Sequence, residues 1–158
     1  MRIHRPIGSA VWGLLIFVLL SLISVWAQQD PIRTVKPLPA ETLLVLNHKP
    51  QAVIVAPANA EGTAVARELQ GRLQEKTGCL LPLASDQDAW SAFWGKSNLI
   101  VVGNLMTNRV FANLYCLHYA CSDGAWPGAG GYEVRTVCEP RGTKQNIIVI
   151  GEIGRAHV

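Results

Sequence analysis

The sequence predicts an α/β fold, a small, mostly parallel sheet with flanking helices and a closing pair of strands. Two observations indicate this fold class. Residues 52–56 and 99–103 are apolar runs rich in β-branched side chains, as in strands that are buried on both faces. Amphipathic helical patterns follow these runs, and such alternation is typical of parallel sheets with right-handed crossovers.

The predicted domain begins with short strands and its clearest helix. Residues 43–46 predict a first short strand that ends at the polar segment 47–50, and residues 52–56 predict the next strand. Asn59 is then placed to cap a helix over 60–77. Apolar side chains recur every four residues along this helix, at Val65, Leu69 and Leu73. A glycine follows directly, where helices commonly end.

Four more elements alternate before the sheet closes: a strand over 80–84, a helix over 86–96, a strand over 99–103 and a helix over 107–115. Trp90 and Trp94 lie one turn apart on the first of these helices, a spacing more typical of core residues than of a ligand site. Residues 119–131 form a loop that contains glycine, proline and serine. Strands over 132–137 and 147–150 then close the sheet, and their short connection allows antiparallel pairing.

Residues 1–27 have the three parts of a secretory signal. A basic start precedes an uncharged apolar run over 11–25, and the residues that follow predict cleavage between Ala27 and Gln28. The alternative is an uncleaved membrane anchor, although this run is shorter than the roughly 20 residues that span a bilayer. We therefore expect a secreted or periplasmic protein that meets a membrane only through an uncleaved signal.

Two further stretches lie outside the predicted α/β domain, which spans 50–151. Residues 28–49 are an extended lead-in whose prolines disfavour helix. Residues 152–158 can be encoded by the start of a common short-read sequencing adapter. We therefore expect them to be translated adapter and the chain to be a fragment of a longer reading frame. A natural C-terminus is the alternative.

Composition and charge exclude several classes of protein. The chain is 49% hydrophobic and 16% charged, unlike a disordered or acidic tail. Without the two ends, residues 28–151 carry 11 basic and 10 acidic side chains. No basic stripe is left to neutralise phosphates, so nucleic acid is not an expected partner.

Four cysteines in an exported chain favour disulfides, and four cysteines allow three pairings. Cys116 and Cys121 are close enough in sequence to bridge the turn after their helix, so they are the candidate pair. Cys79 and Cys138 lie at strand ends, where each can instead be a buried free thiol. His118 would add a third zinc-type ligand to Cys116 and Cys121. We nevertheless expect no metal, because the spacing matches no structural zinc pattern and a fourth ligand is not evident.

No motif for catalysis or cofactor binding stands out. Residues 128–131 have the glycine content of a phosphate loop but neither its lysine nor the helix that follows it. Residues 57–60, which follow the strand over 52–56, lack the glycines that a dinucleotide site needs there. Asp86 and Asp88 lie at a predicted helix start and Glu133 lies on a strand, so no hydrolytic pair of carboxylates is evident. The sequence predicts no catalytic residue and no cofactor.

Trp126 is the candidate for contact with a glycan. It lies in the segment 123–128, which should be an exposed loop, and pyranose faces stack on the rings of tryptophan. Packing of the same ring on a neighbouring domain is the alternative.

Several segments resemble a recurring small α/β domain, the non-catalytic N-terminal domain of secreted carbohydrate-active enzymes such as bacterial β-hexosaminidases and α-glucuronidases. The similar segments are 52–57, 64–73 with Thr77 and Gly78, 81–83, 98–104, 131–135 and 147–151. They cover most of 50–151. The chain departs from these domains at Glu152 and in the longer excursion that holds Cys116, Cys121 and Trp126.

The resemblance implies an accessory domain of a truncated secreted glycoside hydrolase or related polysaccharide-processing enzyme. Its partner would be the missing C-terminal catalytic domain, which holds the catalytic acids in those families, so the fragment itself would be inactive. A free-standing secreted carbohydrate-binding module without enzymatic activity is the alternative. A redox or metal module built on the cysteines is a third hypothesis.

Overall fold

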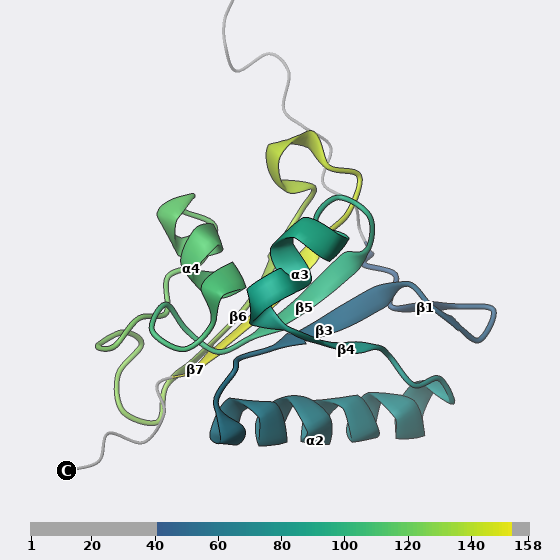
Figure 1. Cartoon of the computed structure of the whole chain (residues 1–158), viewed down its shortest axis with the longest axis horizontal. Coiled ribbons are helices and arrows are strands. Elements are labelled where there is room, and N and C mark those ends of the chain that lie inside the picture. The colour runs from purple at the N-terminus through teal and green to yellow at the C-terminus, as the bar shows by residue number, and fades with distance from the viewer. Residues whose placement is uncertain (1–40, 153–158) are drawn as a thin grey trace, which may run out of the picture. The chain divides into compact units, whose positions relative to one another are not determined.

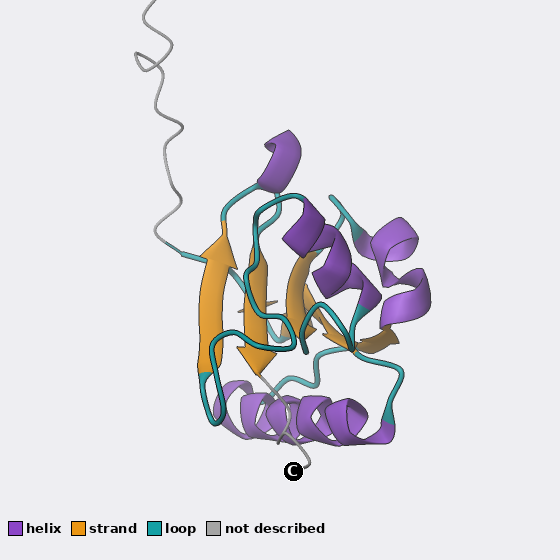
Figure 2. Cartoon of the chain, turned by 90° about the vertical axis from the view of Figure 1, so that its left-hand side faces the viewer, coloured by secondary structure: helices purple, strands orange, loops and turns teal. Residues whose placement is uncertain are grey.

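The computed structural model describes residues 41–152, and their main feature is a five-stranded sheet in the order β4-β3-β5-β7-β6 (Figure 1). The strands are β3 Ala52–Ala56, β4 Leu83–Ser85, β5 Asn98–Val102, β6 Tyr132–Val137 and β7 Ile147–Glu152. β4, β3, β5 and β7 run parallel, and β6 pairs antiparallel with β7 (Figure 2). The predicted fold class, a mostly parallel sheet with flanking helices and a closing strand pair, is confirmed.

The longest helix within residues 41–152 begins and ends where the sequence predicts. α2 spans Ala60–Thr77, and the Asn59 side chain caps it by accepting a hydrogen bond from Gly62 N at 2.7 Å. Gly78 ends the helix with a φ of 67°, which favours glycine. The other α-helices in the described part of the chain are α3 Asp86–Phe93 and α4 Arg109–Cys116.

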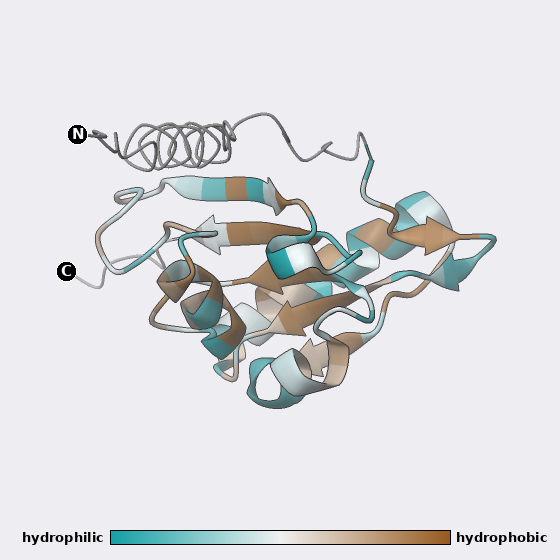
Figure 3. Ribbon diagram, turned by 90° about the horizontal axis from the view of Figure 1, so that it is seen from above, coloured by the Kyte–Doolittle hydropathy of each residue, from teal (hydrophilic) through white to brown (hydrophobic). Residues whose placement is uncertain are grey.

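Helices cover the two faces of the sheet, with α2 on one face and α3 and α4 on the other (Figure 1). Successive strand residues point to opposite faces, so Val53 and Val55 pack on the α3 side while Ile54 packs on the α2 side. Figure 3 shows the resulting apolar character of the central strands. Trp90 and Trp94 stack with ring centroids 3.9 Å apart and pack against the α3-side core, as their spacing predicts.

Several elements differ from the prediction. The first strand is shorter than predicted, and β1 Val45–Leu46 pairs with β2 Lys49–Pro50, inside the predicted polar end of that strand, in a separate antiparallel hairpin. The two linking residues, Asn47 and His48, both have positive φ, the backbone geometry of a two-residue hairpin loop. β4 and α3 are shorter than predicted, and a short 3-10 turn, Pro140–Gly142, lies between β6 and β7.

Some predictions fall on parts of the chain outside residues 41–152. These are the signal segment with its cleavage point at Ala27 and Gln28, most of the lead-in, and the predicted adapter residues after 152. Within 41–152, no helix combines the length and apolar character that crossing a membrane requires.

Candidate functional site

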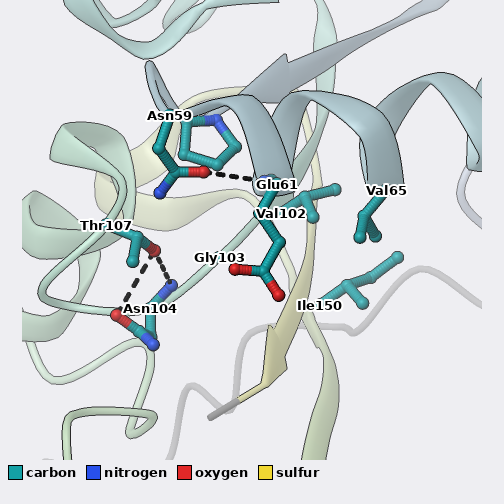
Figure 4. A pocket seen from close by; sticks show the side chains of 10 residues that line it. Asn59, Glu61, Val65, Val102, Gly103, Asn104, Thr107 and Ile150 are labelled. Atoms are coloured by element: carbon teal, nitrogen blue, oxygen red, sulfur yellow. Dashed lines mark hydrogen bonds between the residues drawn. The ribbon is translucent and has the colours of Figure 1, made fainter. Parts of the chain in front are cut away.

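A pocket opens at the carboxyl ends of β3, β5 and β7 (Figure 4). The chain leaves β3 through α2 to reach β4 on one side, and then returns through α3 to β5 on the other side of β3. Open α/β sheets bind ligands at such a switch point, outside the carboxyl ends of the strands. We call this cavity the switch-point pocket. Its lining residues are Pro57, Asn59, Glu61, Gly62, Val65, Val102, Gly103, Asn104, Thr107 and Ile150.

One wall of the switch-point pocket is the first turn of α2. Asn59 caps this turn, and Thr63 Oγ1 donates a hydrogen bond to Pro57 O at 3.0 Å. The turn lies so close to the end of β3 that a Cβ at Gly62 would collide with Pro57 Cγ. This close approach places Glu61 over the pocket (Figure 4).

The opposite wall is the turn that follows β5. Gly103 has a φ of 124°, and a Cβ there would lie 2.8 Å from Thr107 Oγ1, so the position requires glycine. Asn104 N donates to Thr107 Oγ1 at 2.9 Å, and Met106 N donates to Asn104 Oδ1 at 2.8 Å. These bonds fix the shape of the turn.

The lining combines an apolar floor with an acidic rim. Val65, Val102 and Ile150 form the floor, and in Figure 4 the Glu61 carboxylate lies between Asn104 on one side and Ile150 on the other. The volume of about 70 Å³ is roughly that of two water molecules. Pockets for whole ligands usually exceed roughly 300 Å³. The switch-point pocket can therefore enclose the end of a ligand but not a complete sugar ring.

Trp126 lies in an ordered turn connected to the pocket wall. Asp123 Oδ1 accepts hydrogen bonds from Ala125 N and Trp126 N, both at 2.8 Å, and Leu105 N donates to Ser122 O at 3.1 Å. Trp126 is 48% exposed. The exposure predicted for Trp126 is thus found, and its contact with a glycan stays a prediction.

The same hydrogen bonds shift the titration of this turn. Bonds from Trp126 N and Ala125 N lower the pKa of Asp123 below its ordinary value of 3.8. The hydrogen bond that Tyr115 Oη donates to Asp123 Oδ2 at 3.1 Å raises the pKa of Tyr115 above 10.0. The pKa of Asp123 is lower in the folded protein than in the unfolded chain. The stability that the ionised Asp123 contributes to the turn is therefore fully present above about pH 3.8, and it is lost as the pH falls through the folded-state pKa.

We expect the Trp126 turn to stay ordered from neutral pH down to about pH 3.8 and to loosen only below it. The indole N–H signal of Trp126, followed by NMR through an acid titration, measures this change. Asp123→Ala removes the acceptor, so it should show the loosened signal at neutral pH with no acid transition. A transition centred above the ordinary pKa of Asp123 would contradict this account.

Asp86 and Glu133, for which the sequence indicates no partner, each accept hydrogen bonds from backbone N–H groups in the structure. Asp86 is 4% exposed, and its Oδ2 accepts a hydrogen bond from Arg109 N at 2.8 Å, which joins the start of α3 to the start of α4. Glu133 is 5% exposed, and its Oε2 accepts from the backbone N–H groups of Cys121 and Ser122. Both carboxylates therefore hold backbone segments in place.

The predicted disulfide is absent, because Cys116 and Cys121 are both free thiols. α4 ends at Cys116, whose side chain is exposed, and the chain then reverses at His118 with a φ of 61°. The backbone of Cys121 is instead held by Glu133. The prediction of a Cys116–Cys121 pair is therefore wrong for this structure.

Cys79 is a free thiol as well. Cys79 is buried, as predicted, but it lies in the connection between α2 and β4 rather than at a strand end, and its Sγ donates to His48 O at 3.4 Å. Cys138 is half-buried. Among residues 41–152, no three His, Cys, Asp or Glu side chains come together as metal ligands.

Sequence reasoning did not single out Glu61, Asn104 or Thr107. Their positions could have indicated the site, because each follows the carboxyl end of a strand. Glu61 follows Ala52–Ala56, and Asn104 and Thr107 follow Asn98–Val102. Which strand ends lie side by side depends on the strand order, and the sequence pattern does not reveal that order.

No protein-family model and no curated protein matches this chain.

Proposed function

We propose that this chain is the non-catalytic N-terminal accessory domain of an exported, glycoside hydrolase-like enzyme that processes polysaccharide. The domain packs against a catalytic domain that follows it in the secreted or periplasmic protein. The observation that carries the proposal is an uncovered apolar surface on the last two strands. Tyr132 and Val134 of β6 are 76% and 64% exposed. With Ile148 and Ile150 of β7 they form what we call the β6/β7 face.

The register places these four side chains on the α2 side of the sheet. Val134 is paired with Ile150, and Ile148 and Ile150 pack at the edge of the α2-side core. Parallel strands such as β7 are normally covered on both faces. Contiguous exposed apolar patches of this kind mark interaction sites. A neighbouring domain would cover the β6/β7 face. The predicted signal segment and the resemblance to accessory domains of secreted enzymes agree with such an arrangement.

The reading frame in genomic DNA tests whether such a neighbour exists. Several hundred codons after codon 151, encoding a catalytic domain, would support the proposal. A stop codon directly after codon 151 would overturn it and favour a free-standing module.

A pair of matched substitutions tests whether the β6/β7 face is the contact surface. In the protein encoded by the longer frame, Val134→Asp should lower the free energy of unfolding by about 2 kcal/mol more than in the 158-residue chain, because only there is Val134 covered. Met106→Asp is the control, since Met106 is 75% exposed in the turn between β5 and α4. Equal effects of Val134→Asp in the two proteins, measured by denaturant unfolding, would contradict this contact.

The second candidate function is a free-standing secreted carbohydrate-binding module. The exposed ring of Trp126 in a turn held by Asp123 favours it, because a fixed aromatic ring can stack on a sugar at little entropic cost. Affinity electrophoresis in gels with soluble polysaccharides tests it. Trp126→Ala should abolish retardation and Trp126→Phe should keep most of it. Retardation that Trp126→Ala leaves unchanged would remove this candidate.

A further inference from the structure

We propose that the switch-point pocket binds a primary ammonium group carried on a short aliphatic chain. The site goes beyond the accessory role: it shares Ile150 with the β6/β7 face, but its charged and polar groups come from α2 and the turn after β5. Three properties of the lining support it: an unpaired carboxylate, a hydroxyl acceptor and an apolar floor of limited volume.

The carboxylate sets the charge of the ligand. Glu61 lies on the exposed first turn of α2 and extends over the pocket in Figure 4. The ion pairs found within residues 41–152 join Arg72 to Glu68 and Arg135 to Glu133, so no basic side chain of that region pairs with Glu61. An anion in the pocket would be repelled by this carboxylate, whereas a cation would gain an ion pair.

The rim selects a ligand that donates hydrogen bonds. Thr107 Oγ1 accepts one hydrogen bond, from Asn104 N, and donates one to Asn104 Oδ1. A hydroxyl oxygen has two acceptor sites, so one remains on Thr107. A primary ammonium has three donors and no acceptor, and it can serve Glu61 and Thr107 together.

The floor and the volume select the rest of the ligand. Val65, Val102 and Ile150 are the apolar lining residues that the aliphatic part of a ligand would contact. A volume of about 70 Å³ holds an ammonium group and the methylene groups next to it, but not a whole sugar ring. Lysine side chains lie in this way, with the stem on apolar surface and the charged end in polar contact. The ligand is therefore either a free alkylamine or a lysine side chain.

An NMR titration of the full chain with n-butylammonium chloride tests the site, with labelled methyl groups as reporters. We expect saturable shifts at Val65, Val102 and Ile150, at low salt because screening weakens the ion pair. n-Butanol, which has the same aliphatic chain without the charge, should bind at least about threefold more weakly. Binding of n-butanol as tight as that of n-butylammonium, or shifts that do not saturate, would overturn the proposal.

A matched pair of variants separates the pocket carboxylate from general surface charge. Glu61→Gln should weaken n-butylammonium about three- to fivefold, as expected of a partly exposed ion pair. Glu75→Gln, on an exposed position of the same helix, should leave the affinity unchanged. Equal effects of the two variants would overturn the assignment to Glu61. A parallel titration with N-acetyl-lysine methylamide identifies the source, because tighter binding than n-butylammonium indicates a lysine side chain and weaker binding indicates a free amine.

Discussion

Replacing Asn108 by alanine is expected to lower the free energy of unfolding by about 4 kcal/mol. Asn108 is 2% exposed, and its amide group makes four hydrogen bonds. Nδ2 donates to Val55 O at 3.3 Å and to Val102 O at 2.8 Å, while Oδ1 accepts from Val110 N at 2.9 Å and Phe111 N at 3.1 Å. One side chain thus joins the ends of β3 and β5 to the start of α4.

The size of this effect follows from what alanine would leave behind. Loss of a helix cap costs about 1 kcal/mol, and each buried polar group left without a partner costs about 1–3 kcal/mol. In a domain of this size, thermal unfolding should show a fall in Tm of about 20 °C. Because Asn108 supports the turn that lines the switch-point pocket, the variant should lose ammonium binding as well.

Two further variants separate the cap from the bridge between strands. Asn59→Ala removes an exposed cap with a single bond to Gly62 N, so it should cost only about 1 kcal/mol. Asn108→Asp keeps an acceptor for α4 but places a second oxygen against the carbonyls of Val55 and Val102, so it should be nearly as damaging as alanine. If Asn108→Ala lowered the free energy of unfolding no more than Asn59→Ala, the hydrogen bonds of Asn108 to Val55 O and Val102 O would add nothing to stability.

The contrast between these two asparagines shows how far the sequence predicts the fold. Asn59 was predictable as a cap because it directly precedes a clear amphipathic helix, and a cap is a local property. Asn108 also precedes a helix, yet its bonds to Val55 O and Val102 O join residues that are far apart or belong to another element. Strands and helices follow from local periodicity, whereas the bonds that connect them depend on the strand order.

The hairpin at the start of the domain shows a second limit. Asn47 and His48 form its loop with positive φ at both positions, but only asparagine of the two commonly signals such a turn. Residues 43–46 therefore predicted a strand without indicating its partner, and the pairing with Lys49–Pro50 was missed. The switch-point pocket was missed for a related reason, since its walls come from α2, β7 and the turn after β5.

Glu133 is the second residue whose removal should have a large effect, because it holds a loop to an edge strand. Its Oε2 accepts from Cys121 N at 3.0 Å, and from Ser122 N and Ser122 Oγ at 2.9 Å. Its Oε1 lies 3.1 Å from Arg135 Nε, an ion-pair contact without the geometry of a hydrogen bond. The loop that it holds continues into the Trp126 turn, and Ser122 O accepts the hydrogen bond from Leu105 N.

We expect Glu133→Ala to lower the free energy of unfolding by about 3 kcal/mol, because two backbone N–H groups and a hydroxyl lose a charged acceptor in a buried setting. Amide exchange at Cys121, Ser122 and Leu105 should rise more than at the centre of β5, since the loop is released before the sheet. Glu133→Gln keeps one acceptor oxygen and should cost about 1 kcal/mol. Glu75→Ala, at an exposed position of α2, should stay within about 0.5 kcal/mol of the parent. If exchange at Ser122 rose no more than exchange throughout the sheet, Glu133 would stabilise the whole domain rather than this loop.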